Sequence, residues 1–260
     1  MEIDYYEIED RGHQWMYHWL IYMIGGLRRL PGDKVHFICP TFKDQGYHGE
    51  SLAIIEDKYK MIKDPVNGKY LGKHHGEPLL AADRVNQDTY IFLRDLFLSR
   101  VPAQVLNEKG YIYITRKNCE TLNPGNRGLK PTRQILNEED IIPGLRALGF
   151  EILQFEDYSF KKKVEYFQTS KLIISPNSGG LTYSLFADKR STIIEIQPAN
   201  THNMDHYKII CDTLNIPFQR FSDVTVVNGP AVVGNTGWNM IINADAFFTW
   251  LNNTVLNKVI

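Results

Sequence analysis

The chain has 260 residues, of which 43% are hydrophobic and 23% are charged, and its formal net charge is -1. These are the proportions of an ordinary globular protein, long enough for one large domain or two small ones. A near-zero net charge provides no overall field that recruits nucleic acid or an anionic membrane. Three widely spaced cysteines fit neither a disulfide framework nor a zinc site, and they favour a reducing compartment.

The first half of the chain is predicted to mix helices with short strands. A helix is expected over residues 13–30, with Trp15, Trp19, Tyr22 and Met23 at helical spacing on its buried side. Further expected elements are a strand at 35–38, helices at 49–56 and 88–98, an extended piece at 59–62 and a turn-rich loop at 64–78. The apolar run within 15–27 is too short for a membrane anchor, and the acidic start lacks the features of a signal peptide.

Residues 101–110 are polar, with proline and glycine at their ends, and are expected to form a linker. Beyond them, strands and helices alternate regularly. The expected strands are 111–115, 152–155, 171–175 and 192–196. One helix is expected to begin at Asn137, and further helices are expected over 160–169, 181–188, 204–214 and 245–256. Asp140 stands at capping-box distance from Asn137. This alternation predicts a parallel sheet with right-handed crossovers.

The stretch from Lys171 to Pro198 carries the strongest functional signal. A buried strand ends at Pro176, and the turn Asn177-Ser178-Gly179-Gly180 leads into a short helix. The two glycines permit positive φ and a close backbone approach, and the N–H groups of such a turn suit a phosphate or diphosphate. The alternative is a purely structural turn, because the dinucleotide spacing G-x-G-x-x-G is absent.

The segment from Asn177 to Tyr183 resembles the His-Gly-Ala-Gly-Leu-Thr-Asn signature of family-61 glycosyltransferases. Other family motifs are matched in order at 17–20, 112–116, 133–139, 149–152, 157–160 and 195–198. The chain departs from the signature at three positions, where Asn177 replaces histidine, Ser178 replaces glycine and Tyr183 replaces asparagine. These departures put the identity of the donor, and the activity itself, in question.

The resemblance implies an α/β, GT-B-like fold in which two Rossmann-like parallel-sheet domains face a cleft. The acceptor-side domain is expected at 1–105 and the nucleotide-sugar-binding domain at 106–260, with a last helix that can cross back. The implied activity is hexosyl or pentosyl transfer from a nucleotide-diphosphate sugar to a glycan, as in the capsular-polysaccharide and xylosyltransferase-like superfamily. It is expected to be inverting and to need no cofactor besides this co-substrate. The alternative, motivated by Asn177, is a non-catalytic sugar-nucleotide or glycan-binding module.

On the donor side, Arg116 follows a strand end, where ligands of parallel sheets bind, and a guanidinium there suits a diphosphate. The alternative is an ordinary surface arginine. Arg133, within a family motif, is a second candidate for the phosphates. Glu195 is placed either to accept hydrogen bonds from a ribose or as a buried carboxylate satisfied by its neighbours. The remaining expected donor-binding residues are those of the turn and helix: Asn177, Ser178, Gly179, Gly180 and Thr182.

On the acceptor side, His18 is the expected catalytic base, because imidazole titrates in the range that an acceptor hydroxyl requires. The alternative is a packed core histidine, in which case Asp44, His48 and Glu50 are rival bases. No Asp-x-Asp pair follows a buried strand, so no metal ion is expected. Animal and plant members of the family are membrane-tethered or luminal; this chain shows no such address, and we expect it in the cytoplasm. The oligomeric state is not indicated.

Overall fold

The computed structural model describes residues 5–7, 16–32, 35–39, 46–62, 86–117, 133–199, 205–227 and 238–257. The chain divides into two compact units. The first comprises Met1–Ala103 with Ser159–Lys162, and the second comprises Gln104–Tyr158 with Lys163–Ile260. The functional boundary expected between residues 105 and 106 stays a prediction. The expected loop at 64–78 lies outside the described residues.

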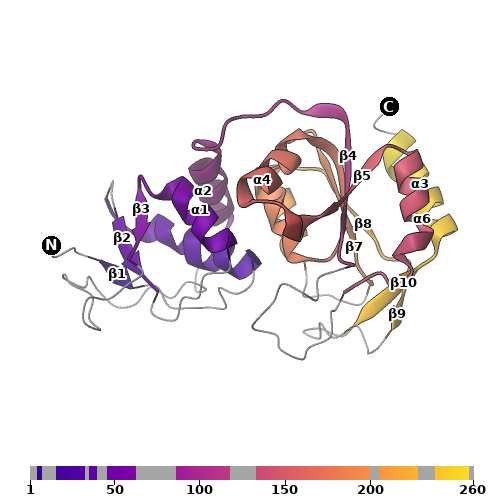
Figure 1. Ribbon diagram of the computed structural model, residues 1–260, viewed down its shortest axis with the longest axis horizontal. Coiled ribbons are helices and arrows are strands. Elements are labelled where there is room, and N and C mark those ends of the chain that lie inside the picture. Colours follow the sequence, from indigo (N-terminus) through magenta and orange to yellow (C-terminus); the bar gives the residue numbers. More distant parts are fainter. Residues whose placement is uncertain are drawn as a thin grey trace. The chain divides into compact units, whose positions relative to one another are not determined.

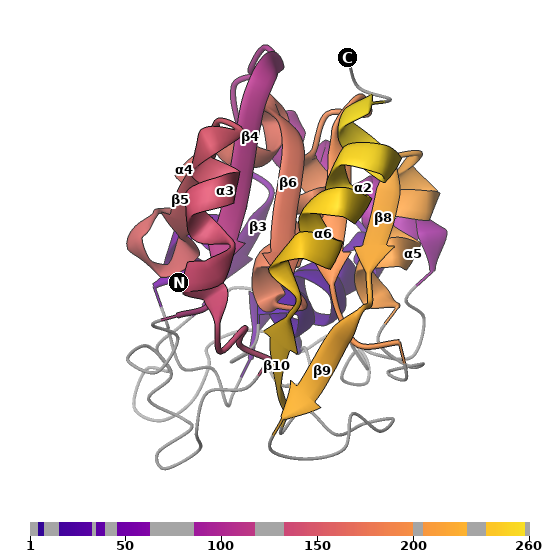
Figure 2. The same cartoon turned by 90° about the vertical axis from the view of Figure 1, so that its right-hand side faces the viewer.

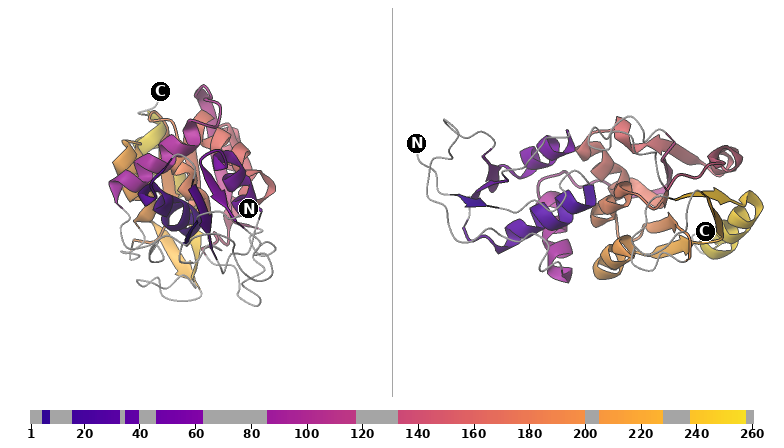
Figure 3. Two further views of the ribbon diagram at one scale, coloured as in Figure 1. Left: turned by 90° about the vertical axis from the view of Figure 1, so that its left-hand side faces the viewer. Right: turned by 90° about the horizontal axis from the view of Figure 1, so that it is seen from below.

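The first unit is built on a parallel sheet with the order β1 (Tyr6–Glu7), β2 (Val35–Ile38) and β3 (Tyr59–Met61). The helix expected at 13–30 is described from residue 16 to 29, with π-type hydrogen bonding over His18–Ile24. Trp19 and Met23 are buried on it, as their spacing predicts. Helix α1 (Tyr47–Ile55) packs beside β3, and α2 (Gln87–Leu98) packs beside the π-helical segment (Figures 1 and 3).

The second unit contains a parallel sheet with the order β5-β4-β6-β7-β8. Its strands are β4 (Asn107–Thr115), β5 (Phe150–Gln154), β6 (Ser170–Pro176), β7 (Thr192–Ile196) and β8 (Phe218–Phe221). In chain order this is second, first, third, fourth, fifth, which is a doubly wound order whose direction switches between β4 and β6. The α/β class, with a parallel sheet in each unit, is therefore confirmed.

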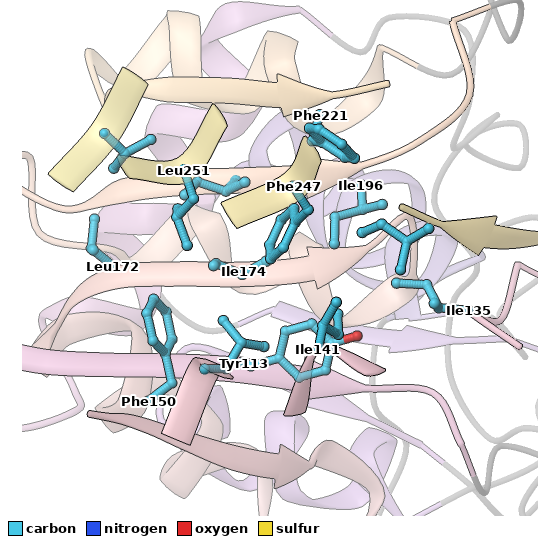
Figure 4. Packing of buried hydrophobic residues seen from close by; sticks show 14 of the residues in the cluster. Tyr113, Ile135, Ile141, Phe150, Leu172, Ile174, Ile196, Phe221, Phe247 and Leu251 are labelled. Carbon is cyan, nitrogen blue, oxygen red and sulfur yellow. The ribbon is translucent and has the colours of Figure 1, made fainter. Parts of the chain in front are cut away.

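Helices cover both faces of this sheet (Figures 1 and 2). Helices α3 (Ile142–Ala147) and α6 (Ala244–Leu251) lie on one face, and α4 (Phe160–Thr169) and α5 (His206–Leu214) lie on the other. Because both faces are covered, β6 and β7 are nearly continuous apolar runs. Figure 4 shows how Leu172 and Ile174 of β6 pack against Phe247 and Leu251 of α6.

A short antiparallel pair, β9 (Val224–Val227) and β10 (Asn239–Ile242), extends the second unit. Residue Ile135 pairs in parallel with Met240 of β10, which attaches the segment around Arg133 to this pair. The chain continues from α6 through a π-helical turn at Asn252–Leu256, whose residues Val255 and Leu256 belong to the core of the second unit.

Three local expectations require correction. Strand β4 begins at Asn107, inside the expected linker. The expected helix at 181–188 is a 3-10 helix at Gly179–Phe186. Neither Gly179 nor Gly180 has positive φ, whereas Gly149, also in the second unit, does. Asn137 makes no capping hydrogen bond to the backbone of the helix that follows, although its Nδ2 donates to the Asp140 carboxylate over 2.8 Å; its side chain also exchanges hydrogen bonds with the backbone of Ile242 in β10. This long-range pairing satisfies the backbone N–H and carbonyl of Ile242 at the end of β10. The local sequence around Asn137 does not indicate such a pairing.

Candidate functional site

The carboxyl ends of β4, β6 and β7 meet at one edge of the sheet in the second unit. Arg116 directly follows β4, Asn177 and Ser178 follow β6, and Gln197 follows β7. Strands β4 and β6 are neighbours with a parallel register, and the strand order reverses between them. In open α/β sheets, ligands bind outside the carboxyl ends at such a switch point. The expected phosphate-binding residues from two distant motifs are thus brought to the position where this fold binds ligands.

Arg133 is brought to this edge by its neighbours in the chain. The Gln134 side chain donates to the backbone carbonyl of Arg116 over 2.8 Å. The buried Glu138 carboxylate accepts from the hydroxyls of Tyr113 (2.6 Å) and Thr115 (2.5 Å) in β4. These bonds fasten the segment that carries Arg133 to the end of β4.

The backbone of Arg133 has the left-handed conformation, with φ 61°, which is uncommon for a residue other than glycine. Its N–H donates to the carbonyl of Trp238 over 2.6 Å, so the conformation is held by pairing with the segment that leads into β10. Non-glycine residues in this region persist where the surroundings over-determine them, often at binding sites. The conformation is one more feature that distinguishes Arg133 from an ordinary surface arginine.

Asn177 connects Arg133 to the interior of the sheet. It is fully buried, and its Oδ1 accepts from Arg133 Nη1 over 2.9 Å. Its Nδ2 donates to Glu195 Oε1 over 2.6 Å and to Gln197 Oε1 over 2.7 Å. Three of the four hydrogen-bonding positions of this carboxamide are therefore occupied by protein groups.

Glu195 is fully buried in β7, and both of its carboxylate oxygens have protein partners. Oε1 accepts from Asn177, and Oε2 pairs with Arg220 of β8, the residue in register with Glu195. Arg220 also pairs with Asp205 over 2.8 Å. Burial raises the pKa of Glu195, and the positive charge of Arg220 opposes the rise. Of the two alternatives for Glu195, the geometry favours the buried carboxylate, although its neighbours are side chains and not backbone.

Tyr207 of α5 is a buried phenol whose pKa is affected by the charges of both arginines. Burial raises the pKa of this phenol to about 12, and the charges of Arg133 and Arg116 both oppose the rise. Thr182 is fully buried.

The turn after β6 is compact. Ser178 is buried, its Oγ lies 3.2 Å from Ser175 Oγ, and its carbonyl accepts from Leu181 N–H in the 3-10 helix. Gly179 and Gly180 are only half-buried. A Cβ atom at Gly180 would lie 3.3 Å from Ser178 Oγ and 3.5 Å from Phe155 Cδ2. A side chain at position 180 would therefore require a small shift of the Ser178 hydroxyl.

The candidate bases belong to the first unit, which is described by itself. His18 is half-buried at the start of the π-helical segment, with its ring centroid 4.9 Å from that of Tyr22. His48 and Glu50 both lie in α1. His48 is fully buried against Trp19, and the Glu50 carboxylate accepts from the Phe160 N–H at the start of α4. Asp44 lies outside the described residues.

Several residues of the site were not singled out from the sequence: Gln134, Glu138, Gln197, Tyr207 and Arg220. Three of them stand inside or beside the family motifs, so a reading of those motifs residue by residue would have included them. Arg220 and Tyr207 carry no local signal, because their partners are distant in the chain.

Within the described ranges, no group of three or more His, Cys, Asp and Glu side chains is placed to hold a metal ion. The same residues contain no helix that is long and apolar enough to span a membrane.

Comparison with known proteins gives a family match. The family model described as Glycosyltransferase 61 matches residues 16–194. No curated protein sequence matches the chain. Among solved structures, the chain is similar to the E. coli heptosyltransferase WaaC with ADP, with a TM-score of 0.44 and 9% sequence identity over 98% of each chain.

Proposed function

The chain belongs to glycosyltransferase family 61, and on this premise we propose that it transfers a sugar from a nucleotide-diphosphate donor to a glycan acceptor. The sugar is a hexosyl or pentosyl group, and the reaction inverts the anomeric centre without a required metal ion. Its context is polysaccharide biosynthesis in the cytoplasm. The nucleotide sugar is a co-substrate, and no further cofactor takes part.

One observation carries this proposal: Arg116 follows β4 and Arg133 is hydrogen-bonded to Asn177, which follows β6, so both arginines stand at the switch point of the doubly wound sheet. A diphosphate is a dianion or trianion with oxygens in the geometry that guanidinium groups bind in bidentate fashion. When the glycosidic bond to the sugar breaks, negative charge increases on the leaving diphosphate. Fixed positive groups stabilise this charge more in the transition state than in the ground state. The two arginines thus supply what a metal ion supplies in other transferases.

The turn after β6 supports the same placement. The half-buried Gly179 and Gly180 expose backbone at the sheet edge, where a side chain would prevent the close approach of a phosphate. Asn177, Thr182 and Glu195 are fully buried, and we assign them to the support of this site. We propose that the base comes from the first unit, and His18, half-buried and aromatic-flanked, is our candidate.

A non-catalytic sugar-nucleotide or glycan-binding module is the second candidate. Asn177 occupies the position of the family's signature histidine, and it is buried in hydrogen bonds to protein groups. If that histidine were required for transfer, this chain would bind a sugar nucleotide without turning it over.

A turnover assay separates the two functions. Sugar nucleotides of UDP, GDP, CDP and dTDP are incubated with a panel of glycan acceptors, and free nucleoside diphosphate and glycan product are measured together. Formation of both supports the transferase, and binding without transfer across the panel supports the module. Two further arms test the details: activity should persist in EDTA, and the product should have the anomeric configuration opposite to that of the donor.

A further inference from the structure

The carboxamide of Asn177 has only one orientation that its neighbours allow. Its Nδ2 faces two acceptors, Glu195 Oε1 at 2.6 Å and Gln197 Oε1 at 2.7 Å. Rotation by half a turn would direct Oδ1 at these oxygens and direct Nδ2 at the guanidinium of Arg133. Both contacts would then be repulsive. The buried acceptors therefore fix Oδ1 toward Arg133.

The acceptors are themselves held in place. Glu195 is in register with Arg220 on the neighbouring strand, and its Oε2 lies 2.7 Å from Arg220 Nη2. Arg220 also reaches Asp205. This ion pair neutralises the charge of Glu195 and leaves Oε1 for Asn177. A neutral amide, in turn, fixes the guanidinium of Arg133 without cancelling its positive charge, whereas a carboxylate in its place would cancel it.

We propose that Asn177 is a positioning residue, which orients Arg133 for the diphosphate of the donor through a hydrogen-bonded line from Arg220 and Glu195, and does not touch the donor itself. The inference rests on the proposed function. Fixing a long side chain before binding lowers the entropy lost when the ligand arrives, so the line contributes to affinity through preorganisation. Arg220 and Arg133 then have separate tasks. Arg220 fixes the hydrogen-bonded line, and Arg133 binds the phosphates.

A double-mutant cycle tests this assignment. The probe is the one among UDP, GDP, CDP and dTDP that binds the wild-type protein most tightly in calorimetry. Asn177→Leu keeps the volume but removes the hydrogen bonds, and Arg133→Met removes the guanidinium. Each single substitution should weaken binding by about tenfold to a hundredfold. Because Asn177 acts only through Arg133, the double variant should bind no more weakly than Arg133→Met alone.

Asn177→His is the second variant, because a neutral imidazole keeps one acceptor for Arg133 and one donor for Glu195. It should retain the wild-type affinity within about threefold. Arg190→Met is the matched control for a lost arginine, since Arg190 pairs with Asp188 at the surface and its side chain is 60% exposed. It should bind like the wild type.

Three results would overturn the inference. Unchanged affinity in Asn177→Leu would remove the role, and a further loss on top of Arg133→Met would mean direct contact with the donor. A loss in Asn177→His as large as in Asn177→Leu would mean that the hydrogen-bonding pattern is not what matters. If the wild-type protein binds none of the four nucleotides, the proposed function fails first, and that outcome is distinct from the other three.

Discussion

Arg116 and Arg133 reach the same edge of the sheet in different ways. Arg116 is placed by the end of β4, whereas Arg133 depends on a left-handed backbone and on bonds to Trp238 and Asn177. Arg116 is therefore the simpler of the two to remove without disturbing its surroundings, although its backbone carbonyl accepts from Gln134.

Arg116→Ala should weaken nucleoside diphosphate binding by about 1.5–3 kcal/mol, the usual contribution of charge-assisted hydrogen bonds. The melting temperature should change little, because the substitution keeps the backbone carbonyl that Gln134 uses. Calorimetric titration of the wild type, Arg116→Ala and the control Arg190→Ala measures the effect. A folded Arg116→Ala protein with wild-type affinity would exclude Arg116 from the site.

Two buried acids of α5 make stability depend on alkaline pH. Burial raises the pKa values of Tyr207 and Cys211 to about 12 each. In an unfolded chain the phenol titrates near about 10 and the thiol near about 8.5. Between these values the unfolded chain has released protons that the folded protein retains, so the free energy of unfolding falls as the pH rises.

We expect urea unfolding midpoints that are level up to about pH 8 and fall from about pH 9 to pH 11. Tyr207→Phe removes one titrating group, so its loss of stability over the alkaline range should be smaller, by up to about 2–3 kcal/mol at full titration of the phenol. Midpoints measured at matched ionic strength give the comparison. Parallel pH profiles for the two proteins would show that Tyr207 is not a buried phenol.

At the scale of elements, the 3-10 helix at Gly179–Phe186 is the structure that shapes the edge of the sheet. Its glycines were expected to permit positive φ, but neither adopts it, and at Gly180 the closest neighbour of an added Cβ is the Ser178 hydroxyl. A Cβ would press on the Ser178 hydroxyl, and a branched side chain would also project toward any ligand above the turn.

Gly180→Val should therefore lower nucleoside diphosphate affinity by at least about tenfold. Gly180→Ala is the matched comparison, since it adds only the Cβ atom, and its loss of nucleoside diphosphate affinity should be smaller. Affinity and melting temperature are measured on both variants, so that a local effect is separated from unfolding. Full affinity in Gly180→Val would make the turn purely structural.

The elements that sequence predicts well are those with strong local patterns. Strands 35–38 and 192–196 and helix 160–169 have the expected bounds, because β-branched runs and helical spacing identify them. The hairpin of β9 and β10 was not predicted, and neither was β8 with its Arg220. The decisive pairs, Arg133 with Asn177 and Glu195 with Arg220, are separated by 44 and 25 residues. Periodicity and capping signals extend over a few residues and carry no information about such pairs.

At the scale of the whole molecule, we propose that the second unit supplies the donor site and the first unit supplies the acceptor base. His18 lies in a π-helical segment, a local irregularity that is frequent at functional sites. His48 is packed in the core and Glu50 caps α4, so the described rivals already have structural tasks.

His18→Gln should lower the turnover number by about 10²–10⁴-fold, the usual contribution of a general base. Nucleotide affinity and melting temperature should stay near their wild-type values, because the glutamine keeps comparable volume and some hydrogen bonding. His36→Gln, in β2 of the same unit, is the matched control. Normal turnover in His18→Gln would place the base elsewhere, with Asp44 as the next residue to test.

The central claim is that the donor diphosphate binds at the carboxyl edge of the sheet in the second unit. Hydrogen exchange measured by mass spectrometry, with and without a saturating nucleoside diphosphate, tests it most directly. The account predicts slower exchange in peptides covering residues 133–140 and 177–186, and little change in α3 and α6, which cover one face of the sheet. Protection confined to other segments, or no protection at all, would contradict it.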